Sequence, residues 1–146
     1  MALQGIREIQ TEINMDFDHM LVACGTGTTL AGLIAAASER TRLWGIAALK
    51  GAEFLIDDVK QLLPRGAGKY GNWNVLLNYH HGGFAKTTPA LLAHMDSFQR
   101  QHSLALDPIY TAKATFAAYD MLDQGCFEPG QRIVLLHTGG LQGART

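Results

Sequence analysis

Short apolar runs alternate along this chain with stretches in which apolar residues recur at every third or fourth position. Four of the runs are apolar at nearly every residue, which is typical of strands that are buried on both faces of a parallel sheet. The pattern predicts these four strands at residues 19–24, 42–49, 73–79 and 132–137.

The stretches between the predicted strands carry helical spacing or helix end signals. Thr88 followed by Pro89 is a start signal, and Gly125 after residues 111–124 is a stop signal. Apolar spacing predicts further helices in the first dozen residues and just before Pro64, where one face would carry Leu55, Val59, Leu62 and Leu63. Residues 30–40 are apolar nearly all round, which predicts a helix packed under other elements.

Alternating strands and helices predict an α/β fold, with a mainly parallel sheet between two helical layers in a three-layer αβα sandwich. The length of 146 residues fits a single domain that covers residues 1–146. In such sheets, ligands bind outside the carboxyl ends of the strands. We therefore expect the site in the segments 24–29, 80–88 and 138–140.

The composition is that of a globular protein, with 47% hydrophobic and 17% charged residues and a formal net charge of −1. No basic stripe is present to hold nucleic acid. The longest apolar run is far shorter than the roughly 20 residues that cross a bilayer, and the start lacks a signal-peptide pattern. The sequence therefore predicts a cytoplasmic protein with no nucleic-acid or membrane partner.

The most unusual segment consists of Gly25, Thr26, Gly27, Thr28 and Thr29, between a predicted strand and a predicted helix. Free N–H groups at a helix start attract anions, and the three hydroxyls add donors. Alternatively, the glycines only permit a tight turn. The P-loop lysine is missing, and a leucine stands where a dinucleotide motif has its third glycine. The segment favours a single phosphate over a dinucleotide.

Other reactive side chains are interpreted as structural. His80 and His81 have no third ligand at a recognisable spacing, so no metal site is predicted. Cys24 has no assignable base and is interpreted as a small buried thiol. Lys86 and Lys113 are interpreted as solvated charges.

Three segments together resemble the 1-aminocyclopropane-1-carboxylate deaminase and D-cysteine desulfhydrase family of fold type II enzymes, which use pyridoxal 5'-phosphate. They are GTGTTLAG at residues 25–32, LDPIYTAKA at 106–114 and RIVLLHTGG at 132–140. They occur in the family's order, and the resemblance covers essentially the whole chain. It implies that the chain is the C-terminal part of the large cofactor domain of such an enzyme.

The resemblance also implies roles for individual residues. The segment 25–29 would bind the cofactor phosphate, and Tyr110 would lie against the pyridine ring and take part in proton transfer. Thr111 and Thr138 would stand beside the pyridine nitrogen, and Gly139 would contact the cofactor with them. The deaminase pattern has a glutamate after the tyrosine, which would keep that nitrogen protonated. Two threonines therefore favour D-cysteine desulfhydrase over 1-aminocyclopropane-1-carboxylate deaminase.

Two departures from the family pattern bear on catalysis. Phe84 stands where these enzymes usually have a second active-site tyrosine, and it lacks the hydroxyl. Loss of a general acid or base lowers a rate by on the order of 10²–10⁴. The Schiff-base lysine of the family lies in an N-terminal half that we expect to be missing here, and no lysine of this chain matches it.

Two functions therefore remain open. In the first, the complete protein is an enzyme that performs β-elimination on a small amino acid such as D-cysteine, giving an α-keto acid and ammonia; the chain alone is expected to be inactive. In the second, the chain is a non-catalytic truncated or split module that binds a phosphate-bearing ligand. A nucleotide-binding fold of another kind is a third, weaker alternative. An unpaired strand edge and apolar surface predict association, as a homodimer or with the missing N-terminal half.

Overall fold

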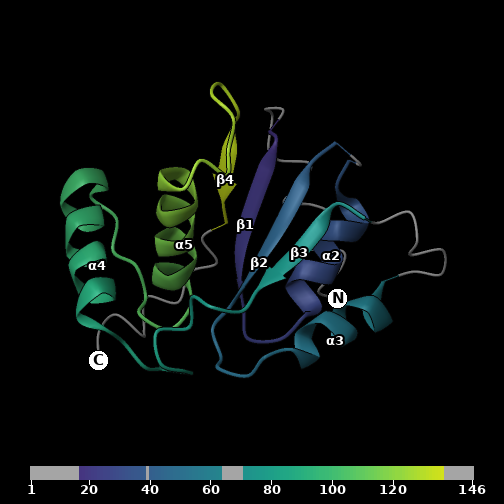
Figure 1. Cartoon of the computed structure of the whole chain (residues 1–146), viewed down its shortest axis with the longest axis horizontal. Coiled ribbons are helices and arrows are strands. Elements are labelled where there is room, and N and C mark those ends of the chain that lie inside the picture. Colours follow the sequence, from purple (N-terminus) through teal and green to yellow (C-terminus); the bar gives the residue numbers. More distant parts are fainter. Residues whose placement is uncertain (1–16, 39, 64–70, 137–146) are drawn as a thin grey trace.

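The computed structural model describes residues 17–38, 40–63 and 71–136 (Figure 1). The predicted helix in the first dozen residues lies outside them. No helix in these ranges is long and apolar enough to cross a membrane. The elements in chain order are β1 (His19–Cys24), α2 (Thr28–Ala36), β2 (Arg42–Ala47), α3 (Phe54–Leu62), β3 (Trp73–Leu76), α4 (Pro89–His102), α5 (Thr111–Asp123) and β4 (Ile133–Leu135).

The four strands form one parallel sheet in the order β3-β2-β1-β4. β1 pairs with β2 along its whole length, from His19 opposite Arg42 to Cys24 opposite Ala47. On its other side β1 pairs with β4, and β2 pairs with β3. The predicted parallel sheet is confirmed, and all the carboxyl ends of its strands lie at one edge.

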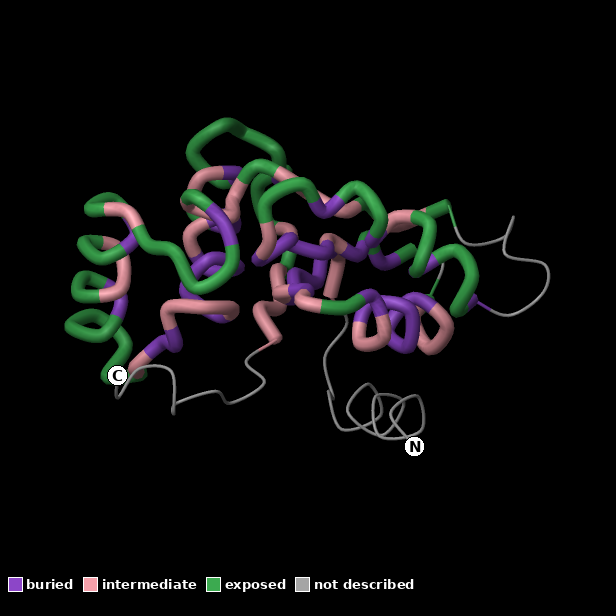
Figure 2. Tube along the Cα trace, turned by 90° about the horizontal axis from the view of Figure 1, so that it is seen from below, coloured by how far each residue is buried: buried purple, intermediate pink, exposed green. Residues whose placement is uncertain are grey.

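Helices cover both faces of the sheet. Met20 and Val22 of β1 point into a core with α2 and α3, whereas Leu21 points into a second core with α5. α4 packs against α5 on the side away from the sheet (Figure 1). Buried positions concentrate between these layers, and much of α4 is exposed (Figure 2). The chain therefore has the predicted α/β fold with three αβα layers.

The local end signals are confirmed where they were predicted. The Thr88 hydroxyl accepts the N–H of Leu91 at 3.1 Å, with Pro89 in the first turn of α4. Gly125 has φ of +75° and donates its N–H to the Leu122 carbonyl at 3.1 Å, just after α5 ends. Both ends are set by contacts within four residues, which is why the sequence indicates them.

Some predicted boundaries were wrong. β3 ends at Leu76 rather than at Tyr79, because the chain leaves the sheet edge there and the Tyr79 hydroxyl donates to Asp120 of α5 at 2.6 Å. Along α3 and its C-cap, the buried row is Leu55, Val59 and Leu63, at i, i+4, i+8 spacing. That row turns Leu62 outward, and it is 46% exposed.

Candidate functional site

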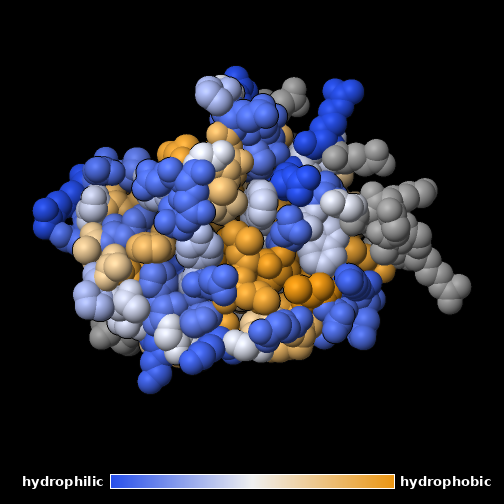
Figure 3. Space-filling view, in the orientation of Figure 1, coloured by the Kyte–Doolittle hydropathy of each residue, from blue (hydrophilic) through white to orange (hydrophobic). Residues whose placement is uncertain are grey.

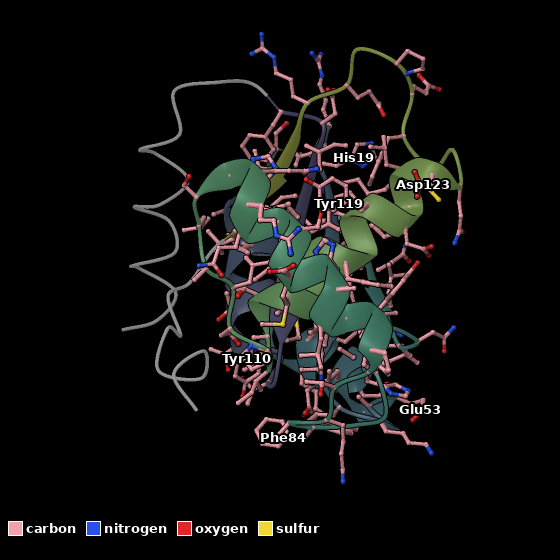
Figure 4. All side chains as sticks on the ribbon, turned by 90° about the vertical axis from the view of Figure 1, so that its left-hand side faces the viewer. His19, Glu53, Phe84, Tyr110, Tyr119 and Asp123 are labelled. Atoms are coloured by element: carbon pink, nitrogen blue, oxygen red, sulfur yellow. The ribbon has the colours of Figure 1, made fainter. Side chains whose placement is uncertain are left out.

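A pocket of about 350 Å³ opens at the carboxyl ends of β1 and β2, at the sheet edge where the fold rule places ligands. It is lined by five of the predicted site residues, together with Ala23 and Leu49; the five are Gly25, Thr26, Thr29, Phe84 and Tyr110. Phe84 and Tyr110 lie at one end of the molecule, far from His19 and Asp123 (Figure 4). The fold thus brings together segments from four separate parts of the chain.

The segment 25–29 divides into two structural roles. Gly25, Thr26 and Thr29 line the pocket. Gly27 is instead the N-cap of α2, and a Cβ there would lie 2.8 Å from Cγ2 of Val59, so this glycine lets α2 pack closely on α3. Thr28 begins α2 and is half-buried.

The start of α2 fits an anion. Its first internal hydrogen bond runs from the N–H of Ala31 to the carbonyl of Gly27, so the N–H groups before Ala31 have no partner within the helix. Within the described residues, no side chain caps this end and no acidic residue lies in its first turn. The helix dipole and these donors therefore suit a phosphate group beside the exposed Thr26.

Two aromatic rings complete the pocket. The ring of Tyr110 rests on the backbone of Gly25, where a Cβ would lie 3.0 Å from Cε1. The Phe84 ring lies 6.1 Å from the Tyr110 ring at 59° and is 51% exposed. The pocket thus has an aromatic wall that carries one hydroxyl, that of Tyr110.

Asp107 fixes the position of Tyr110, and sequence reasoning assigned it no role. Its buried carboxylate accepts the backbone N–H groups of Ile109 at 3.1 Å, Tyr110 at 2.6 Å and Thr111 at 3.0 Å. It also accepts the Thr111 hydroxyl proton. An aspartate just before a proline and a predicted helix is a turn and capping signal that identifies such a residue.

Thr111 does not line the pocket. Its hydroxyl accepts the N–H of Asp107 at 3.0 Å and donates to the Asp107 carboxylate, so it serves the start of α5. Thr111 faces a separate cavity of about 120 Å³ beside Leu135 and Leu136, at the end of β4. Thr138 and Gly139 lie outside the described residues. The roles of Thr111 and Thr138 near a pyridine nitrogen, and the contact of Gly139 with the cofactor, stay predictions.

Lys113 is fully buried, so its interpretation as a solvated charge was wrong. Its ammonium donates to the carbonyls of Gly83 at 2.9 Å and Ala48 at 3.3 Å. Burial lowers the pKa of Lys113, and the negative charge of Asp107 acts in the opposite direction. The signal in the sequence is weak: its neighbours in α5 are small residues that a sheet readily covers. Lys86 is exposed, as predicted.

His80 and His81 each have one structural partner, and the buried Nε2 of His81 has none among the described residues. His81 Nδ1 lies 2.8 Å from the Thr88 hydroxyl oxygen, and His80 Nδ1 accepts the N–H of Gly82 at 3.0 Å. Burial raises the pKa of the Cys24 thiol to about 12, so the thiol stays protonated near neutral pH. Cys24 is therefore the small buried thiol that the sequence indicated.

Comparison with known proteins identifies relatives along almost the whole chain. Residues 4–139 match the family described as pyridoxal-phosphate dependent enzyme. A putative 1-aminocyclopropane-1-carboxylate deaminase from Pyrococcus furiosus is 32% identical, over 94% of this chain and 44% of its own length. A protein of Arabidopsis thaliana named bifunctional D-cysteine desulfhydrase/1-aminocyclopropane-1-carboxylate deaminase, mitochondrial, is 28% identical, over 97% of this chain and 38% of its own length.

A crystal structure described as that of an ACC deaminase homologue is also similar. It superposes on 98% of this chain with a TM-score of 0.79 and 29% sequence identity, and the match covers 46% of that protein. The chain thus spans less than half the length of these relatives. The cofactor in the family's description, pyridoxal phosphate, carries a phosphate, which the start of α2 fits. The chain belongs to the family of pyridoxal-phosphate dependent enzymes.

Proposed function

We propose that this chain supplies the phosphate-binding and aromatic part of a pyridoxal-phosphate site, in a protein that performs β-elimination on a small amino acid. The pocket itself carries the proposal, because Gly25, Thr26 and Thr29 meet Tyr110 there beside the free N–H groups of α2. Pyridoxal phosphate, when bound, supplies an electron sink that weakens the bonds at the substrate Cα. The family and its deaminase relatives support this reaction class.

The pocket residues would have separate roles in binding the cofactor. The N–H groups and hydroxyls of Thr26 and Thr29 would hold the phosphate by hydrogen bonds to its oxygens. Tyr110 would cover the ring, and its hydroxyl can hold or release a proton at the pocket wall. Phe84 would exclude water from the same wall without exchanging a proton.

D-cysteine is the substrate that we favour, with 1-aminocyclopropane-1-carboxylate next. The family resemblance places position 111 near the ring nitrogen, although in this structure the Thr111 hydroxyl bonds to Asp107 outside the pocket. A threonine there has no negative charge, so it would not hold that nitrogen in its protonated form as a glutamate would. A less protonated nitrogen gives a weaker electron sink, which still supports loss of a Cα proton and β-elimination. The Arabidopsis relative is named for both activities, which agrees with a narrow difference between them.

The second candidate function is a non-catalytic module, and the lysines favour it for the chain on its own. Among the described residues, no lysine lines the pocket. Lys113 is bonded to two carbonyls, whereas Lys50, Lys60 and Lys86 are exposed. We therefore expect the isolated chain to bind pyridoxal phosphate reversibly and to lack activity.

We further propose that another polypeptide covers one side of the sheet. Among the described strands, β3 is an edge strand that pairs with β2 alone. Hydrophobic side chains gather over the sheet between α5 and β3 (Figure 3). A groove of about 490 Å³ there includes Trp44, Leu76 and Met121. Such a surface invites association, either with the part of the protein that the relatives carry beyond this match or with a second copy.

Titration of the chain with pyridoxal phosphate and, separately, with pyridoxal tests the proposed site. We expect the phosphate form to bind at least about tenfold more tightly, because only it has charged oxygens for the α2 donors. Thr26→Ala should remove part of that difference. Equal affinity for the two compounds would contradict a phosphate site at α2.

A further inference from the structure

Lys113 lies where the elements that line the pocket meet. One of its acceptors, the Ala48 carbonyl, immediately follows β2 and immediately precedes Leu49. The other, the Gly83 carbonyl, immediately precedes Phe84. Both Leu49 and Phe84 line the pocket. One buried ammonium therefore joins two pocket segments that are far apart in the sequence.

The same lysine is anchored close to the third segment. Lys113 is in the first turn of α5, which begins directly after Tyr110. Asp107 fixes that turn through its bonds to Tyr110 and Thr111. The position of the Lys113 ammonium is thus fixed relative to the Tyr110 side of the pocket. Because the ammonium bonds to the Gly83 carbonyl, the length of the lysine side chain limits how far Phe84 can lie from Tyr110.

The segment 80–86, which carries Phe84, adopts a backbone that needs external support. His81 and Ala85 have φ of +55° and +58°, and Gly82 and Gly83 have φ of +103° and +130°. Positive φ is unfavourable for residues with a Cβ and persists only where the surroundings hold it. The buried Gly83 carbonyl accepts two bonds, from the Lys86 N–H at 3.0 Å and from Lys113. Lys113 is therefore part of that support.

Burying a cation costs desolvation free energy unless its hydrogen bonds offset that cost. Lys113 lies between Ala112 and Ala114, both buried, so a methionine would fill the same space without a charge. In the described part of the chain its ammonium bonds to carbonyls rather than to a carboxylate. What it contributes is donors that reach two loops at once.

We propose that Lys113 is a positioning residue that holds segment 80–86 against the end of β2 and so sets the width of the pocket between Phe84 and Tyr110. The identity of the ligand in that pocket rests on the proposed function. The contact by which Lys113 holds segment 80–86 does not rest on the proposed function, and it can be measured without ligand.

Hydrogen exchange of the free chain tests the hold directly. In Lys113→Met we expect peptide 80–87 to exchange faster, on the order of tenfold, because the segment opens locally, while β1 keeps its protection. Lys86→Met is the matched control, since Lys86 is exposed in the same segment, and it should leave exchange unchanged. Unchanged exchange of peptide 80–87 in Lys113→Met would overturn the proposal.

Ligand binding gives a second readout. Lys113→Met should weaken pyridoxal phosphate binding severalfold, and Lys86→Met should not. If the unmodified chain binds no pyridoxal phosphate, the proposed function fails, and the exchange result still decides the role of Lys113. Faster exchange with unchanged affinity would overturn the claim that Lys113 sets the pocket width.

If Lys113→Met does not fold, a variant in segment 80–86 tests the same contact. Gly83→Ala places a Cβ where φ is +130° and should displace the carbonyl, so that the Lys113 amine becomes reactive toward an acetylating reagent. Gly71→Ala is the control, because nothing lies within 4 Å of a Cβ there. Acetylation of Lys113, located by mass spectrometry, should rise only in Gly83→Ala. Continued protection in that variant would contradict the hold.

Discussion

The ring of Tyr110 lies directly on the backbone of Gly25, so closely that a Cβ at Gly25 would be 3.0 Å from Cε1 and 3.1 Å from the hydroxyl oxygen of Tyr110. Contacts that short require one of the two groups to move. Because Gly25 has no side chain, the residue after β1 and the residue before α5 can lie in direct contact. This contact places Tyr110 at the pocket.

Gly25→Ala should therefore damage the site more than the fold. We expect a loss in pyridoxal phosphate affinity of about tenfold or more as Tyr110 is displaced, with destabilisation of roughly 1–3 kcal/mol from overpacking. Gly71→Ala, in open space, should change neither quantity. Titration and urea unfolding measure the two effects, and undiminished affinity in Gly25→Ala would show that the contact with Tyr110 has no part in binding.

Asp107→Ala should destabilise the chain by about 2 kcal/mol, because the N–H groups of Ile109, Tyr110 and Thr111 lose their acceptor. Asp96→Ala is the control: its pair with Arg100 is on the exposed face of α4, and such pairs contribute little. Urea unfolding should separate the two variants clearly. Equal midpoints would mean that the Asp107 bonds do not stabilise the start of α5.

Stability should fall as the pH falls below neutral. Burial lowers the pKa of His94 and of His81 in the folded chain, and the charge of Lys113 adds to the effect at His81. As the pH drops through about 6.5, the ordinary histidine pKa, the unfolded chain therefore takes up protons first and the free energy of unfolding decreases. Above that pH, His81 and His94 are neutral in both the folded and the unfolded chain, and their contribution to the free energy of unfolding is fully present.

His94→Gln tests this pH dependence. A glutamine can keep a bond to Thr115, whose hydroxyl oxygen lies 2.9 Å from His94 Nε2, but it does not titrate. Urea unfolding at pH 7.5 and 5.5 should show a smaller difference in this variant. His102→Gln, at an exposed position, should keep the original difference. A His94 variant with an unchanged pH dependence would exclude His94 as its source.

The two cysteines should differ sharply in reactivity. Cys24 is buried with its pKa raised to about 12, whereas Cys126 is exposed. Ellman's reagent should therefore label one thiol quickly in the native chain and the second only after denaturation, and Cys126→Ser should remove the fast phase. Fast native labelling in Cys126→Ser would mean that Cys24 is accessible.

Cys126 also reports on association, because it lines the groove between α5 and β3. If a second copy covers that groove, labelling of Cys126 should slow as the chain concentration rises, and light scattering should show a dimer or larger assembly. A monomer at micromolar concentration with a constant labelling rate would contradict association through this surface.

Local signals predicted much of this fold, and distant contacts account for what was missed. β1 and the start of α4 follow from patterns within a few residues, and they are confirmed. Lys113 was misread because its acceptors, Gly83 and Ala48, lie 30 and 65 residues away in sequence. No local pattern reports such a bond, whereas a lysine near a loop usually faces solvent.

The candidate site was predicted in part. Composition alone singled out the segment 25–29, but it could not show which of its residues face a pocket. Gly27 packs against Val59 of α3, whereas Gly25 packs against Tyr110 at the pocket. Both partners are distant in sequence. The meeting of Phe84 with Tyr110 was implied by the family resemblance rather than by spacing. The cytoplasmic location and the roles of Thr138 and Gly139 stay predictions.

The central claim is that the start of α2 holds the phosphate of pyridoxal phosphate beneath Tyr110. Amide chemical shifts of the isotope-labelled chain, followed by NMR during titration with pyridoxal phosphate, test it most directly. The largest shifts should fall on residues 25–29 and on Tyr110, and inorganic phosphate should reproduce those at 25–29. Shifts confined to the groove of Trp44, Leu76 and Met121, or no shifts at all, would contradict the claim.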